Sequence, residues 1–237
     1  MMWEVVPFSA AVTPPPPPPV PWTFGAKTVG PRSSAATSAS IPLPTNSAGD
    51  LLFFVFTTLD VSNTNDPGNP TLPGGWTTID STNLPGNFSA DCHVTVAYKV
   101  SNGAEGASIS VSWSLSQPFD FLMQTITPPP GKSAVFDTYA ANSSPGREIS
   151  HGSPTLSGLV TAQDLLLDVW VDAGGQNPYS LDPLMTLVYL ENQGAGNTGN
   201  ITVGTINVLS STSALSYTET AGGLAVFRSL AVAYKAV

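Results

Sequence analysis

The sequence predicts an all-β protein: an antiparallel, jelly-roll-like β-sandwich built of two related halves, with an extended proline-rich N-terminal arm. Helix signals are nearly absent, because no window keeps a 3.6-residue apolar period without interruption by Gly, Pro or β-branched residues. Short segments rich in Val, Ile, Thr, Phe and Tyr recur between Gly, Pro, Asn and Asp, which is typical of strands in a sandwich. Two signatures also recur in order: Asp-Leu-Leu at 50–52 and 164–166, and Val-Ala-Tyr-Lys at 96–99 and 232–235.

A third element lies inside each copy. It is a Gly- or Pro-containing turn followed by a short apolar strand, at residues 75–79 and again at 184–189. This ordered recurrence predicts that the Asp-Leu-Leu segments are corresponding central strands of two related halves.

Composition narrows the class of protein. The chain of 237 residues is long enough for one large sandwich or two small domains. Only 10% of residues are charged, against about 25% in an average globular domain. A surface of hydroxyls and amides is typical of β-rich extracellular, cell-surface or virion proteins. The net charge of −9 argues against binding to nucleic acid or an anionic membrane, which requires clustered Lys and Arg.

The cysteine content and the N-terminal residues indicate the cellular compartment in which the protein is made. Cys92 is the single cysteine, so no internal disulfide is possible, and its position in a strand-like segment predicts a small core residue. No segment approaches the roughly 18 apolar residues of a membrane span. The first seven residues lack the basic start of a signal peptide, so synthesis in a cytoplasm is expected.

Residues 1–22 differ from the rest and are interpreted as an arm. Trp3, Val5, Val6 and Phe8 are apolar and precede six consecutive prolines. Such a run forms a stiff polyproline II rod of about 3.1 Å per residue and cannot join a sheet interior. We interpret the arm as an apolar plug and a rigid spacer, after which Trp22 and Phe24 enter the body. A disordered, solvated tail is the alternative, although such a tail has no need of apolar side chains. The expected partner-binding residues are Trp3, Val5, Val6, Phe8, Pro14, Pro15, Pro16, Pro17, Pro18 and Pro19.

The body spans residues 23–237, with halves at about 23–140 and 155–237. Residues 51–56 are apolar at every position, which predicts a strand buried on both faces, whereas residues 107–113 alternate between apolar and hydroxyl side chains. Segments 60–75 and 140–154 are rich in turn residues and are expected to be exposed connections. The expected strands are 39–43, 50–59, 75–80, 93–100, 107–114, 120–126, 133–139, 155–160, 164–171, 184–190, 200–208, 214–219 and 223–236.

Three ordered stretches carry a family resemblance: Ser-Ala-Gly-Asp-Leu-Leu at 47–52, Pro-Gly-Gly-Trp-Thr at 73–77, and Val-Ala-Tyr-Lys-Val-Ser-Asn-Gly-Ala-Glu-Gly at 96–106. The body, from about residue 24 onward, resembles β-sandwich modules of tailed-bacteriophage structural proteins of the head-decoration, tail-fibre and baseplate kinds. The resemblance implies a virion structural role without chemistry, with assembly in the host cytoplasm. It does not cover the arm.

The histidines give no catalytic pattern. A Ser-His-Asp unit requires a histidine beside a nucleophile and an acid. His93 lies in an expected strand beside Cys92, His151 lies in the connection between the halves, and no G-x-S-x-G elbow occurs. We therefore expect both histidines to be structural and the protein not to be an enzyme.

Metal and carboxylate sites are equally weakly indicated. Two histidines and one cysteine without clustered spacing are a poor zinc site. Calcium stays open for loop residues 60–66, although turn formation explains that loop's Asn and Asp residues more simply. No cofactor or metal is therefore expected. A glycosidase pair requires two acids about 5–10 Å apart, and nothing selects a pair among Glu105, Asp120, Asp137, Glu148, Asp172 and Asp182.

Exposed aromatic residues could bind a glycan by stacking. Trp76, Trp113 and Trp170 lie within strand patterns and are expected in the core. Tyr179 follows a Gly-, Asn- and Pro-rich segment and is the better candidate for an exposed contact.

These observations predict a non-enzymatic virion structural protein, a capsid decoration (cement) protein attached through its arm. The chain lacks the coiled-coil or repeat shaft of a long fibre, which favours decoration. The alternatives are a tail-fibre or collar protein, or a receptor- or carbohydrate-binding adhesin module. Expected partners are the major capsid protein or a tail or collar protein, together with further copies of this chain.

Overall fold

The computed structural model describes residues 20–30, 33–60, 68–84, 91–144, 148–156, 164–173, 180–181, 185–190, 198–207 and 218–237. Every regular element among them is a β-strand, and every strand pairing is antiparallel. The all-β antiparallel class expected from the sequence is therefore confirmed.

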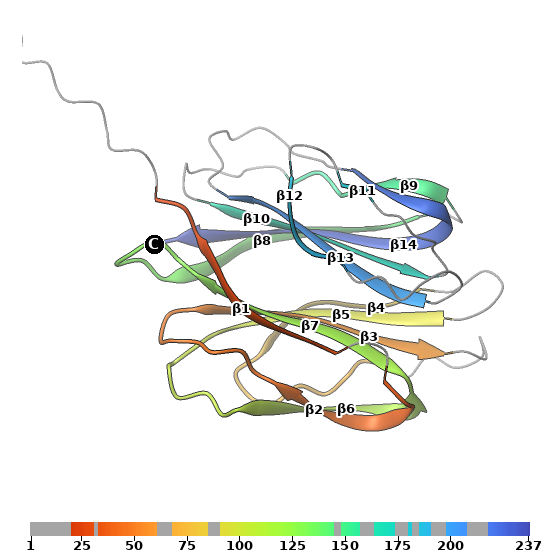
Figure 1. Ribbon diagram of the computed structural model, residues 1–237, viewed down its shortest axis with the longest axis horizontal. Coiled ribbons are helices and arrows are strands. Elements are labelled where there is room, and N and C mark those ends of the chain that lie inside the picture. Colours follow the sequence, from red (N-terminus) through yellow and green to blue (C-terminus); the bar gives the residue numbers. More distant parts are fainter. Residues whose placement is uncertain are drawn as a thin grey trace, which may run out of the picture.

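The first large sheet has five strands in the order β1-β7-β3-β5-β4 (Figure 1). Its central strand, β3, pairs with β5 on one side and with β7 on the other. A separate two-stranded sheet, β2-β6, lies against it (Figure 1). The bounds of these strands are β1 (Thr23–Gly30), β2 (Ala36–Pro42), β3 (Leu51–Asp60), β4 (Thr77–Leu84), β5 (Asp91–Val100), β6 (Ser108–Gln117) and β7 (Phe119–Thr127).

The second large sheet has seven strands. Its main path runs β11-β14-β10-β13-β12, and β8 and β9 also pair with β14. The 19-residue β14 is long enough to hold β8 along its C-terminal part and β9 along its N-terminal part. The bounds are β8 (Ala134–Ser143), β9 (Glu148–Gly152), β10 (Leu165–Ala173), β11 (Ser180–Leu181), β12 (Thr186–Leu190), β13 (Thr198–Asn207) and β14 (Thr218–Ala236).

The first sheet is the middle of three layers, with β2-β6 on one face and the second sheet on the other (Figure 1). Because successive side chains of a strand point to opposite faces, β3 contributes to two cores. Leu51, Phe53 and Val55 pack between the two large sheets. Leu52, Phe54 and Phe56 pack against β2-β6. The uninterrupted apolar sequence of β3 is thus explained by burial on both faces, as expected.

A smaller apolar cluster lies on the face of the second sheet that points away from the first sheet. We call it the outer cluster, and its buried members are Leu156, Leu166, Trp170, Met185, Ala231 and Ala233. The same strands send alternate residues, such as Leu167 and Val169 of β10, into the core between the sheets.

The recurring sequence signatures correspond in part. β3 and β10 are both internal strands, and each pairs antiparallel with the strand that carries Val-Ala-Tyr-Lys, β5 and β14 respectively. The registers differ by two residues, because Tyr98 lies opposite Phe53 whereas Tyr234 lies opposite Leu165.

The third recurring element occupies different positions in the two sheets. β4 pairs with β5, but β12 pairs with β13 and not with β14. The sequence pattern did not predict this difference, because short apolar strands pair wherever a matching edge is available. The strand order therefore supports a repeated strand pair, and does not establish either two equivalent halves or a jelly-roll.

The segment 140–154 is not the exposed connection that its composition indicated. β8 extends to Ser143, β9 follows, and Ser144, His151 and Ser153 are buried. The reason is β14, whose N-terminal part offers β9 a partner over residues 218–225.

Other strand limits also differ from expectation. β1, β9 and β11 were not among the expected strands, and the two expected at 214–219 and 223–236 are one continuous strand where described. Of the strand expected at 155–160, only residues 155–156 are described, and they form no named strand.

Candidate functional site

The residues expected to contact a partner lie outside the described residues. This applies to the apolar and proline positions of the arm, Trp3, Val5, Val6, Phe8 and Pro14–Pro19, and to Tyr179. The body that receives the arm is described from Val20 onward, so the structure shows how the chain is fixed at that point.

Trp22 fixes the chain where the arm joins the body. Val20 is 48% exposed, whereas Trp22 is only 2% exposed and belongs to the core between the two large sheets. The next residue, Thr23, begins β1 and lies opposite Thr127 of β7. Trp22 therefore lies in the core, which agrees with the expectation that the chain enters the body at this residue.

The C-terminus lies at the same end of the molecule as the start of β1 (Figure 1). Val237 exchanges two backbone hydrogen bonds with Ser133, of 2.8 and 3.1 Å, just before β8. We call this end, formed by residues 20–23, the turn at 128–133 and Val237, the arm end. Val20, Val135 and Val237 are exposed there.

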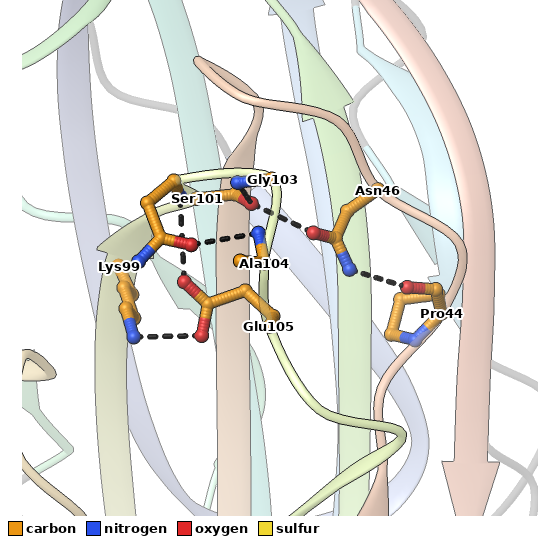
Figure 2. A network of polar contacts seen from close by, with 8 residues as sticks. Pro44, Asn46, Lys99, Ser101, Gly103, Ala104 and Glu105 are labelled. Atoms are coloured by element: carbon orange, nitrogen blue, oxygen red, sulfur yellow. Dashed lines mark hydrogen bonds and ion pairs between the residues drawn. The ribbon is translucent and has the colours of Figure 1, made fainter.

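The third motif of the resemblance forms a braced turn after β5 (Figure 2). Lys99 Nζ donates to Glu105 Oε2 at 2.7 Å, and the backbone N–H of Asn102 donates to Glu105 Oε1 at 3.3 Å. The backbone N–H of Ala104 donates to Asn102 Oδ1 at 2.8 Å. The hydrogen bond from Lys99 is the main cause that holds the pKa of Glu105 below its ordinary value. The Lys and Glu of the motif thus bind each other.

The braced turn is also tied to the segment before β3 (Figure 2). Ser101 Oγ donates to Asn46 Oδ1 at 2.7 Å and accepts from the Gly103 backbone N–H at 3.0 Å. Asn46 Nδ2 donates to the Pro44 carbonyl at 2.9 Å. Gly103 has a φ of +80°, and a Cβ there would lie 3.0 Å from the Ala48 nitrogen, so glycine is required on both counts.

The first motif completes this connection. Asp50 accepts from the Ser47 backbone N–H and from Thr127 Oγ1, each at 2.7 Å. The backbones of Gly49 and Asp50 also bond to Ser101, at 2.9 and 2.8 Å. Asp50 therefore joins three segments at one end of the first sheet.

The second motif has a packing role. Gly75 has a φ of +86° and lies beneath the Lys99 side chain. Trp76 is half-buried and meets Phe54 edge-on, with ring centroids 5.8 Å apart. Trp113 and Trp170 are buried, as expected for core residues. All three motifs thus stabilise the fold.

Both histidines are buried and contact neighbouring side chains. His93 is buried, and its Nε2 lies 2.9 Å from Ser81 Oγ, which in turn lies 2.9 Å from Thr95 Oγ1. His151 is buried and stacks on Phe227, with centroids 5.6 Å apart and planes at 9°.

The candidate carboxylates are dispersed, and two of them are engaged by lysines. Glu105 bonds Lys99, and Asp137 bonds Lys235 at 2.7 Å. Asp120 and Asp172 are buried, while the side chains of Glu148 and Asp182 lie outside the described ones.

A further carboxylate, Asp80, joins the two large sheets. It forms a two-bond ion pair with Arg228, of 2.7 and 3.0 Å, which links β4 to β14. Sequence reasoning missed this pair, because its members lie 148 residues apart.

Asp168 is the buried carboxyl group that the sequence reasoning overlooked. It is 0% exposed on β10, in the outer-facing row that also holds Leu166 and Trp170. Burial raises its pKa to about 8, and a hydrogen bond from Ser153 lowers it only in part. A detectable signal existed: Asp168 interrupts an apolar strand at a position where its neighbours are core residues.

A pocket of about 240 Å³ opens between β1 and β12, at the edge of the two large sheets opposite the Asp80–Arg228 pair. Lys27 crosses this edge, because its Nζ donates to the Val188 carbonyl at 3.0 Å and lies 5.3 Å from the centre of the Tyr189 ring. The lining is Phe24, Gly25, Lys27, Gln124, Thr186, Leu187, Val188 and Thr205.

Metal and membrane sites can be assessed only where the structure describes the chain. In that part, no cluster of three or more His, Cys, Asp or Glu side chains could hold a metal ion. The calcium possibility at residues 60–66 falls almost wholly outside the described residues. Among the described residues there is also no helix that could cross a bilayer.

No family model, curated protein or solved structure matches the chain.

Proposed function

We propose that this protein is a non-enzymatic structural component of a tailed-bacteriophage virion, a decoration protein that attaches to the capsid through residues 1–22. Its direct partner is the major capsid protein, and further copies of the chain surround the same site. The protein is assembled onto particles in the host cytoplasm. A tail or collar protein is the alternative partner.

One observation carries this proposal: the burial of Trp22. The body is anchored at Trp22 and β1, so we expect it to fold without residues 1–19. From the sequence, we expect the six consecutive prolines to form a rod of about 19 Å that keeps Trp3 and Phe8 away from the body. Large apolar side chains at that distance are useful when they are buried in a partner, where such anchors supply much of the affinity.

The roles of the motif residues add support. The residues that carry the resemblance to phage modules brace one end of the first sheet through short hydrogen bonds and an ion pair. A rigid, loop-braced body with little charge on its surface suits a protein that must persist on a particle. We also propose that the β3–β5 and β10–β14 pairs descend from one repeated strand pair within a jelly-roll-like sandwich.

Deletion of residues 1–19 tests the attachment. The shortened body is expected to keep the circular dichroism spectrum and unfolding midpoint of the full chain and to lose incorporation into particles. The measurement mixes the purified protein with particles lacking it, followed by sedimentation. Trp3→Ala with Phe8→Ala in the full chain should reproduce the loss.

Two controls complete the experiment. Val5→Ala alone removes a smaller apolar side chain of the arm and should weaken occupancy less than the double substitution. Val29→Ala, at an exposed position on β1 away from the arm end, should leave occupancy unchanged. Wild-type occupancy by the 1–19 deletion would show that attachment is made by the sandwich itself, and the arm proposal would then be abandoned.

A further inference from the structure

The outer face of the second sheet contains a carboxyl group in an apolar niche. Asp168 is fully buried, and its neighbours across the sheet are Gly204 on β13 and Ala231 on β14. Neither neighbour has a side chain beyond Cβ, so the niche is walled by Leu166 and Trp170 of the outer cluster. Water is excluded from the carboxyl group, so the ionised form would lose its hydration there.

The partners of Asp168 are too weak to stabilise a charge. Neither carboxylate oxygen has a partner of ordinary hydrogen-bonding geometry among the described residues, although the Ser153 hydroxyl lies close enough to act on the group. Burial is the largest influence on the pKa of Asp168 and raises it to about 8.

Other titratable groups face the same region without neutralising Asp168. Asp172 of β10 and Asp164, just before that strand, lie in the same outer-facing row, and both are buried. His151 of β9 stacks on Phe227. Lys235 of β14 bonds Asp137 and feels the charge of Asp164. From β13, Gly204 and Thr202 face the group, and neither titrates. The pKa of Asp168 is raised chiefly by burial and lowered in part by Ser153.

The niche is covered by Gly152, the last residue of β9, and by the chain that follows it. We call residues 152–156 the cover segment. Ser153 is buried beside Asp168, Leu156 belongs to the outer cluster, and Ser229 Oγ donates to the Gly152 carbonyl at 3.2 Å. By contrast, β10 beneath the niche is held by continuous ladders to β13 and β14. The cover segment is therefore the part that can separate at least cost.

We propose that Asp168 and the cover segment form a proton-operated latch: the segment stays seated on the second sheet while Asp168 carries its proton, and it lifts when the carboxyl ionises. On ionisation the O–H bond of the carboxylic acid breaks and the proton passes to solvent water. The anion cannot remain in the dry niche without a counter-charge, so water enters and the cover segment yields. Closure follows when the proton returns.

The test uses a thiol placed in the cover segment of the full chain. In a Cys92→Ala background, Leu156→Cys is alkylated at about pH 6.5 and about pH 9, on either side of the Asp168 transition. The same alkylation rate is measured for Leu156→Cys combined with Asp168→Asn. The rate with Asp168 intact is divided by the rate with Asp168→Asn, so that the pH dependence of thiol ionisation cancels. The expected ratio is near one at the lower pH and rises about tenfold or more at the higher pH, because an asparagine side chain cannot ionise. A ratio that is the same at both pH values would overturn the latch.

A second measurement does not depend on the cysteine variant. In the wild-type chain with ¹³C-labelled Asp carboxyls, the Asp168 resonance should titrate near pH 8. Ser153→Ala should move that midpoint upward, because the hydrogen bond from Ser153 favours the ionised form. A midpoint near the ordinary aspartate value would refute the proposal. Asp137→Asn, at the ion pair with Lys235, should leave the Asp168 midpoint unchanged.

Discussion

At the scale of single residues, buried polar groups affect the free energy of unfolding more than exposed polar groups do. Tyr234 is fully buried between the two large sheets, and its hydroxyl has no hydrogen-bond partner among the described residues. Its ring meets those of Tyr98 and Phe136 edge-on, with centroids 5.5 and 5.9 Å away. Burial raises the pKa of Tyr234 well above its ordinary value. The aromatic contacts therefore stabilise the core, whereas the hydroxyl opposes burial.

Tyr234→Phe tests that division. The substitution keeps the ring contacts and removes an unsatisfied buried hydroxyl, whose burial costs about 1–3 kcal/mol. We expect the free energy of unfolding to stay equal or to rise by about 1–2 kcal/mol, measured by urea denaturation. Tyr139→Phe, at an exposed position, should change it by less than about 0.5 kcal/mol. A loss of stability in Tyr234→Phe would reveal a hydrogen bond to the hydroxyl.

Asp168 gives the unfolding free energy a pH dependence of known sign. The folded chain holds this proton up to about pH 8, whereas the unfolded chain releases it near 3.8. The contribution of Asp168 to the free energy of unfolding is therefore fully present below pH 3.8 and falls as the pH rises toward 8. Above about pH 8 it no longer changes. The slope is about 1.4 kcal/mol per pH unit. The Lys99–Glu105 contact gives the unfolding free energy a pH dependence of the opposite sign. Because this contact lowers the pKa of Glu105, its contribution to stability is lost as the pH falls below about 4.5.

Asp168→Asn should remove the slope between about pH 5 and pH 8 and make the chain more stable than the wild type at neutral pH. Urea denaturation at several pH values in that range measures both effects. Asp137→Asn provides the comparison and should retain the wild-type slope. Parallel pH profiles for wild type and Asp168→Asn would mean that Asp168 is already ionised in the folded state.

At the scale of elements, β3 and β10 are the two strands on which the sheets depend. Both have a strand neighbour on either side. β3 has apolar clusters on both faces. β10 has a full core on its inner face, but an outer face that mixes Leu166 and Trp170 with buried carboxyl groups. Because the outer face of β10 is only partly apolar, it accommodates Asp168. Residues 51–56 of β3 are apolar on both faces and carry no charge.

Alanine substitutions measure these strands. Leu52→Ala and Leu166→Ala, each at a buried position, should lower the free energy of unfolding by about 2–5 kcal/mol through lost burial and a residual cavity. Thr77→Ala, at an exposed position on β4, should stay within about 0.5 kcal/mol. Chemical denaturation of the three variants gives the comparison, and similar midpoints for all three would contradict the facing described here.

At the scale of the whole molecule, the two large sheets are joined by a core and by a side-chain hydrogen bond at each edge. Arg228 on β14 reaches Asp80 on β4 with two hydrogen bonds, and its third contact is Ser143 at 3.1 Å. The side chains of the pair are 13% and 10% exposed, so solvent screens them little. At the opposite edge Lys27 bonds the Val188 carbonyl. At each edge of the sandwich, a basic side chain of one sheet or the other, Lys27 or Arg228, therefore bonds across to the opposite sheet.

A double-mutant cycle isolates the bond between the sheets. With Asp80→Ala, Arg228→Ala and the double variant, we expect a coupling free energy of about 1–3 kcal/mol, between the values for exposed and fully buried pairs. The Lys235–Asp137 pair is more exposed and lies within one sheet, so its cycle should give a smaller coupling free energy. Equal coupling in the two cycles would show that burial at the sheet edge adds nothing.

The sequence by itself determined the class and the local elements of this protein. Alternating and uninterrupted apolar segments predicted nearly every long strand, because side-chain burial on one or two faces is written directly into residues such as Leu51–Phe56. It also predicted that Cys92 and Trp170 are core residues, since each lies in such a pattern.

Only the tertiary structure decided which strands are neighbours and which distant side chains meet. β8 and β9 join β14, β12 joins β13, and Asp80 meets Arg228 although 148 residues separate them. Local periodicity carries no information about these pairings, because a strand can pair with any edge of matching length and face. The niche around Asp168 arises in the same way, from Gly204, Ala231 and Ser153 brought together by three separate segments. Its raised pKa is therefore a property of the folded sheet and not of the sequence around Asp168.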